Sequence, residues 1–67
     1  MSFAQEQMQV AVYRNYSDEL HAAIDTGNPD EARRVMHDAL QAWKDDNLTL
    51  QQLGDIRSDF LTMGIGA

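Results

Sequence analysis

The stretch Thr26-Gly27-Asn28-Pro29-Asp30-Glu31 divides the chain into helices. Gly27 predicts the end of one helix, because glycine enters the left-handed backbone region without steric cost. Asn28 predicts the N-cap of the next helix, with Pro29 at its first position and Glu31 as the capping-box partner. The stretch therefore predicts a helical hairpin with a turn of only a few residues.

The segment before this turn, residues 3–26, predicts one long helix. Ser2 and Gln5 fit a capping box at its start, and neither Gly nor Pro occurs between them and Gly27. Its second half has apolar side chains at helical spacing, namely Tyr13, Tyr16, Leu20, Ala23 and Ile24. Two alternatives stay open: the helix is continuous, or it breaks between Asn15 and Ser17, where either residue could form a new cap.

A second helix is predicted over residues 29–45. One apolar stripe runs along it, formed by Ala32, Val35, Met36, Ala39, Leu40 and Trp43. On the solvent-facing side, Asp30 and Asp38 each lie four residues from Arg34, so two ion pairs are expected.

A third helix is predicted over residues 50–63. Thr49 and Gln52 form its capping box, and Gly64 is a suitable C-cap before a frayed tail at 64–67. Its apolar stripe consists of Leu50, Leu53, Ile56, Phe60 and Met63. Gly54 lies inside this helix, where its missing side chain would permit the close approach of a neighbouring helix.

These elements predict an all-α fold, a helical hairpin plus a third helix, in a single helical domain over residues 1–67. No segment alternates as a strand does. A chain of 67 residues has a marginal core, which a second subunit or a partner often completes. The domain is therefore either a small three-helix bundle or half of a homodimeric bundle.

The turn also resembles part of a known repeat. Gly27 to Ala32, followed by Ala39-Leu40, resembles the middle of a tetratricopeptide repeat over about 28 residues. Tyr16 stands where that family has its first-helix aromatic, whereas Glu19-Leu20 stands where it prefers Leu-Gly. A single copy cannot stack into a binding groove, so the resemblance implies only a helical hairpin.

Composition excludes several classes of function. The chain has 11 acidic and 5 basic side chains, a formal net charge of −6, and no Cys. The negative charge argues against direct nucleic-acid binding, and the lack of Cys excludes disulfides and thiolate chemistry. No apolar run is long enough for a membrane span, and Met1 to Met8 contains Glu6 but no basic residue, unlike a signal peptide. We therefore expect a cytoplasmic protein that binds no membrane.

Few residues could perform chemistry, so we expect no enzyme activity and no cofactor. No Ser is part of a recognisable His–acid arrangement, and there is no Gly-rich phosphate loop. Asp18, His21 and Asp25 share one helix face at i, i+3 and i+7, where they could hold a divalent ion. A metal- or ligand-binding helical module is thus one alternative, although a solvated acidic surface explains these residues more simply.

The expected lengths of the first two helices indicate binding to another protein rather than chemistry. The first helix would span ~36 Å and the second only ~24 Å, so the first two or three turns would extend beyond the hairpin. Those turns carry apolar side chains without intramolecular cover, namely Phe3, Met8, Val10 and Val12. We expect another protein or a second copy of the chain to cover them.

The sequence therefore predicts a small non-catalytic protein–protein interaction module, a regulator, adaptor or inhibitor. The predicted binding edge consists of Phe3, Met8, Val12, Tyr13 and Tyr16, and an acidic rim would select basic partners. The alternative is an acidic nucleic-acid mimic that inhibits a DNA-binding protein. Its phosphate-like array would comprise Glu6, Asp18, Asp25, Asp45, Asp46, Asp55 and Asp59.

Overall fold

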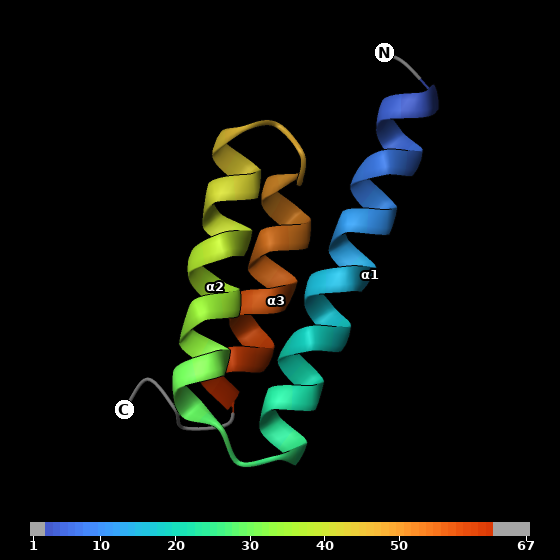
Figure 1. Ribbon diagram of the computed structural model, residues 1–67. Coiled ribbons are helices and arrows are strands. Elements are labelled where there is room, and N and C mark those ends of the chain that lie inside the picture. The colour runs from blue at the N-terminus through green and yellow to red at the C-terminus, as the bar shows by residue number, and fades with distance from the viewer. Residues whose placement is uncertain (1–2, 63–67) are drawn as a thin grey trace.

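Three α-helices form the protein in a computed structural model that describes residues 3–62 (Figure 1). Helix α1 spans Phe3–Asp25, α2 spans Pro29–Lys44 and α3 spans Leu50–Thr62, with no strand among the described residues. Each helix packs against the other two. The all-α three-helix bundle is therefore confirmed, and α1 runs without a break through Asn15 and Ser17. The expected cap at Ser2, apolar contact of Met63 and frayed tail at 64–67 lie outside the described residues.

The turn between α1 and α2 satisfies the end of α1 with backbone bonds and the start of α2 with a side chain. Gly27 has φ 65°, and the Asn28 N–H donates to the Ala23 carbonyl at 2.9 Å. The Asn28 side chain then accepts from the Glu31 N–H at 3.2 Å, which confirms the predicted N-cap. The capping box is incomplete, because the Asn28 N–H is already bonded and the Glu31 carboxylate accepts from Arg34 instead.

The turn after α2 repeats this arrangement without a glycine. Asp46 has φ 64°, and its N–H donates to the Trp43 carbonyl at 3.0 Å. The Asn47 N–H donates to the Ala42 carbonyl at 2.8 Å, which completes a Schellman motif. Asp is one of the few residues that tolerate a left-handed conformation, so Asp46 ends the helix where glycine is usual.

The start of α3 has the predicted capping box. The Gln52 N–H donates to Thr49 Oγ1 at 3.1 Å, and the Thr49 N–H donates to Gln52 Oε1 at 3.0 Å. Gly54 follows within the helix, but a Cβ placed there would meet no atom within 4 Å. The expected close approach of a helix at Gly54 is therefore wrong, because this position faces open solvent.

The core is small and rich in alanine. Its buried side chains are Leu20, Ala23, Ala32, Val35, Ala39, Ala42, Leu48, Leu53 and Ile56. Most were expected from the apolar stripes, but Leu48 lies in the loop before α3 and Ala42 replaces Trp43 as the innermost residue at the end of α2. Leu40, Trp43 and Leu50, which the stripes placed inside, stay exposed.

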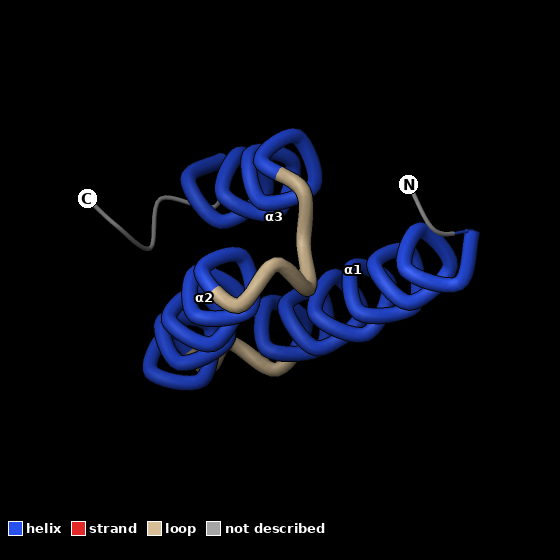
Figure 2. Tube along the Cα trace, turned by 90° about the horizontal axis from the view of Figure 1, so that it is seen from above, coloured by secondary structure: helices blue, strands red, loops and turns tan. Residues whose placement is uncertain are grey.

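The bundle opens at one end. The buried residues of α1 are Leu20 and Ala23, both in its last turns, and its first half diverges from α2 and α3 (Figures 1 and 2). The start of α1 lies at the same end as the α2–α3 turn. We call this end, formed by residues 3–10 and 40–52, the open end.

Candidate interaction surface

Large apolar side chains gather at the open end. The exposed ones are Phe3, Met8, Val10, Leu40, Trp43, Leu50 and Leu61. All of them except Leu61 belong to the open end, whereas the buried side chains of α1 lie toward the opposite end. The fold therefore separates a closed, packed end from an end with uncovered apolar surface.

The predicted binding edge does not form one face. Phe3 is 73% exposed and Met8 47% exposed, but five positions along a helix place them about 140° apart. Val12, Tyr13 and Tyr16 are partly buried and pack against the core. The structure thus packs these last three against the core and leaves Phe3 and Met8 on different sides of α1.

The overhang of α1 is shorter than expected. Gln5 Nε2 donates to a carboxylate oxygen of Asp46 at 2.8 Å, and Gln9 Nε2 donates to the Asp46 carbonyl at 3.2 Å. The α2–α3 turn therefore reaches α1 at Gln5, and Val12 also has cover within the chain. Length alone overestimated the overhang, because it left out the residues of the turn after α2.

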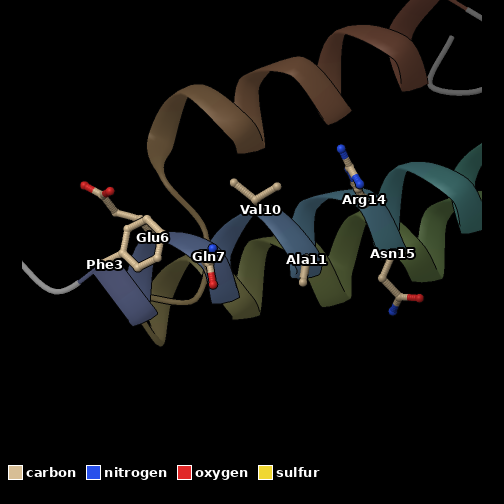
Figure 3. Close-up of a pocket in the computed structure, with 7 residues that line it drawn as sticks. All are labelled: Phe3, Glu6, Gln7, Val10, Ala11, Arg14 and Asn15. Atoms are coloured by element: carbon tan, nitrogen blue, oxygen red, sulfur yellow. The ribbon is translucent and has the colours of Figure 1, made fainter.

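A shallow hollow lies along the outer side of α1 (Figure 3). We call its lining the outer stripe, which consists of Phe3, Glu6, Gln7, Val10, Ala11, Arg14 and Asn15. Val10 is 45% exposed, and Glu6 and Arg14 are exposed as well. Sequence reasoning noted Phe3 and Val10 but not the stripe. The signal that could have found it is the helical spacing of residues 3, 7, 10 and 14.

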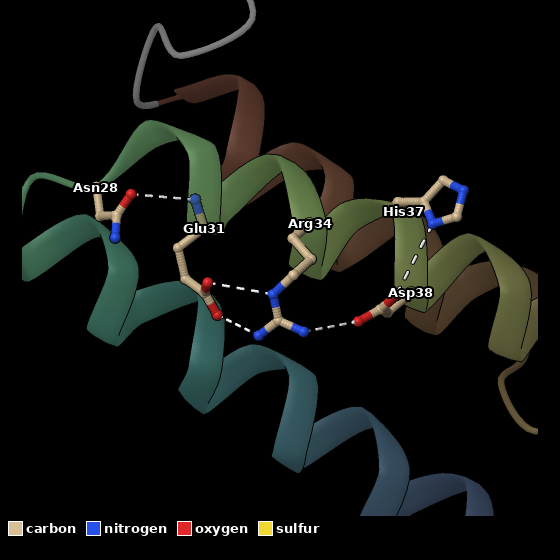
Figure 4. A network of polar contacts seen from close by, with 5 residues as sticks. All are labelled: Asn28, Glu31, Arg34, His37 and Asp38. Carbon is tan, nitrogen blue, oxygen red and sulfur yellow. Dashed lines mark hydrogen bonds and ion pairs between the residues drawn. The ribbon is translucent and has the colours of Figure 1, made fainter.

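Charged side chains on α2 form a connected surface network (Figure 4). Arg34 binds the Glu31 carboxylate and also donates to Asp38 at 3.2 Å. Asp30 pairs with Arg33 at 2.9 Å instead of with Arg34. One of the two predicted i,i+4 pairs, Arg34–Asp38, is therefore confirmed, and the other is replaced by two i,i+3 pairs.

The network lowers the pKa of Glu31 and raises that of Arg34, and the pKa of Tyr16 nearby is raised as well. The hydrogen bond from Arg34, with the positive charge of the guanidinium, lowers the pKa of Glu31 although partial burial opposes this effect. Burial raises the pKa of the Tyr16 phenol, and the negative charges of Asp38 and Glu19 raise it further. These carboxylates come from α2 and α1, and the guanidinium of Arg34 brings positive charge to the same place.

The histidines do not complete a metal site in the described residues. His21 Nε2 lies 3.4 Å from Asp59 Oδ2 on α3, and His37 Nδ1 lies 3.8 Å from Asp38 Oδ1. Residues 3–62 contain no group of three or more His, Asp or Glu side chains able to hold a metal ion. Asp18, His21 and Asp25, which share a helix face in the sequence pattern, are therefore not gathered around a common point.

Acidic groups of the expected phosphate-like array lie on α1, on α3 and in the α2–α3 turn, and none of them lies on α2. Asp46 accepts a hydrogen bond from Gln5, and Asp59 faces His21. Two of the seven carboxylates of the array, those of Asp46 and Asp59, are therefore already in contact with side chains of the chain itself.

Comparison with known protein families, curated proteins and solved structures found no match. Within residues 3–62, none of the helices has both the length and the apolar character that crossing a membrane requires.

Proposed function

We propose that this chain is a non-catalytic protein–protein interaction module, a small regulator, adaptor or inhibitor that acts by occupying its partner. The observation that supports this most is the group of six exposed large apolar side chains at the open end. Apolar surface that a small protein leaves uncovered commonly marks interaction sites, and here it lies on more than one side of the open end. Phe3, Met8 and Trp43 are also of the residue types that anchor interfaces.

Charge would govern which partner binds and how fast. The chain has 11 acidic and 5 basic side chains and a formal net charge of −6. A negative rim speeds encounter with a basic partner and disfavours acidic ones. We also propose that this activity takes place in the cytoplasm, since a chain without Cys depends on no disulfide.

The proposal is tested with two variants of matched chemistry. Met8→Gln with Leu50→Gln removes apolar surface at the open end, and Leu61→Gln removes it from a side chain at the opposite end that is also 50% exposed. We expect wild type and Leu61→Gln to capture the same partner from the native host and the double variant to lose it. Thermal unfolding of each variant verifies that the bundle still forms.

Two alternatives predict other results. An acidic nucleic-acid mimic would bind a basic target with steep salt dependence and would tolerate the Met8 and Leu50 substitutions, whereas apolar docking depends weakly on salt. A metal-binding module would show a higher thermal midpoint when calcium, zinc or nickel is titrated. Equal capture by wild type and both variants would contradict the proposed function.

A further inference from the structure

The outer stripe of α1 contains one acid and one base that have no ionic partner in the described chain. Glu6 and Arg14 are both exposed, and neither forms an ion pair or side-chain hydrogen bond within residues 3–62. Val10 lies between them, four residues from each. Figure 3 shows the three side chains in a row along the same side of α1. This row is therefore apolar at its centre, negative at one end and positive at the other.

Such a row is complementary to itself when two copies meet in opposite directions. A two-fold interface places the same patch of each subunit against the other, so any ionic pairing must occur between a residue and its counterpart across the axis. With Val10 on the axis, the residue four positions before it faces the residue four positions after it in the second copy. Glu6 then faces Arg14 of the second copy, and Arg14 faces Glu6 of the second copy.

We propose that the outer stripe of α1 pairs antiparallel with the outer stripe of a second copy, centred on Val10. This inference rests on the proposed function, because it names the occupant of the α1 part of the open end. The parallel arrangement is disfavoured, since it would place Glu6 against Glu6 and Arg14 against Arg14. Rows of residues four apart are also the ridges through which helices commonly interlock.

The exposure of the apolar side chains on the outer stripe agrees with this pairing. Phe3 is 73% and Val10 45% exposed, so a second helix can reach both side chains without any change in the bundle. A single helix–helix contact is smaller than the ~1,200 Å² of buried surface that stable complexes exceed. The pairing is therefore weak, and self-association occurs at micromolar or higher concentrations of protein.

Charge reversal tests the ionic part of the pairing. Glu6→Arg places two bases on the row and Arg14→Glu places two acids on it, so each variant repels its own copies. We expect sedimentation equilibrium to show dimerisation of wild type and at least about tenfold weaker dimerisation of each variant. An equimolar mixture of the two variants restores association, because every acid again faces a base. Circular dichroism verifies that both variants stay helical.

Cross-linking tests the register. Because the chain has no Cys, Val10→Cys introduces a single thiol, and at a two-fold axis it lies beside the same thiol of the second copy. Ala22→Cys is the control, since it is also exposed on α1 but lies 12 residues from the axis. Mild oxidation is expected to give a disulfide-linked dimer with Val10→Cys and a monomer with Ala22→Cys.

Several outcomes would overturn the pairing. These are a wild-type monomer at millimolar concentration, a dimer unaffected by either charge reversal, a mixture of variants that stays dissociated, or equal cross-linking at both positions. None of these experiments changes Met8 or Leu50, so the pairing can fail while capture of another protein through those residues still succeeds. Conversely, a dimer with the predicted register and no captured partner supports the pairing and contradicts an adaptor role.

Discussion

The side chain of Gln5 donates a hydrogen bond to the carboxylate of Asp46 across 2.8 Å, although 41 positions of the chain separate them. Asp46 also accepts from Gln9 through its carbonyl and has a left-handed backbone, with φ 64°. Asp46 therefore ends α2 and also binds the first turns of α1 through two hydrogen bonds. This contact connects the divergent part of α1 to the rest of the bundle.

The backbone of Asp46 gives the first prediction. Asp46→Ala and Asp46→Gly both remove the carboxylate that binds Gln5, but only alanine is strained in the left-handed conformation. We expect the alanine variant to be less stable than the glycine variant by about 1 kcal/mol in urea-induced unfolding. Asp45→Ala is the control, because Asp45 has φ −86°. Equal stability of the two Asp46 variants would contradict the structure of this turn.

Two glycines are expected to respond in opposite directions. Gly54 is helical and a Cβ there would meet nothing within 4 Å, so Gly54→Ala should raise the free energy of unfolding by about 1 kcal/mol. Gly27 also has open space around it but φ 65°, so Gly27→Ala should lower that free energy by about 1 kcal/mol. Urea titrations of both variants measure this contrast. A shift of the same sign in both would show that space, rather than backbone conformation, decides the effect.

The capping box of α3 gives a third prediction. Thr49→Ala leaves the Gln52 N–H without its acceptor and should lower the free energy of unfolding by about 1 kcal/mol. Thr49→Ser retains an oxygen at this position and should restore most of the loss. Thermal and urea unfolding provide the measurement, and a Ser variant no more stable than the Ala variant would rule out a capping role for Thr49.

The fourth prediction concerns acid stability. The hydrogen bond from Arg34 lowers the pKa of Glu31, so the folded state favours the ionised carboxylate more than the unfolded state does. This contribution is complete above the pKa of unfolded Glu31 and disappears as the pH falls through the lower pKa of the folded state. Arg34→Gln should move the Glu31 pKa toward its ordinary value, as NMR titration of the side-chain carboxyl would show. An unchanged Glu31 titration in that variant would contradict the network in Figure 4.

The helices could be predicted from the sequence because their signals are local. Gly27 with Asn28, and Thr49 with Gln52, fix three helix ends through bonds between residues no more than five apart. Burial was harder to predict, because it depends on how the helices are placed. Leu50 fits the apolar stripe of α3 but is 67% exposed, since it lies where α1 has diverged from the bundle.

The candidate surface could be predicted only in part. Phe3 and Met8 were expected to be uncovered and are exposed, whereas Tyr13 and Tyr16 pack against the core. Chain length indicated that α1 is long, but periodicity did not show how the turn around Asp46 reaches it. That contact depends on a left-handed Asp, which leaves no regular pattern in the sequence.

The buried alanines of the core limit which amino-acid substitutions the chain can accept. Ala23, Ala32, Ala39 and Ala42 have almost no side-chain volume to lose, and any larger residue would push the helices apart. Mutational drift at these four sites is thus confined to small residues, while solvent-facing sites are free to diverge. Distant relatives of the protein should be recognisable by this conserved spacing of small residues more readily than by their overall identity.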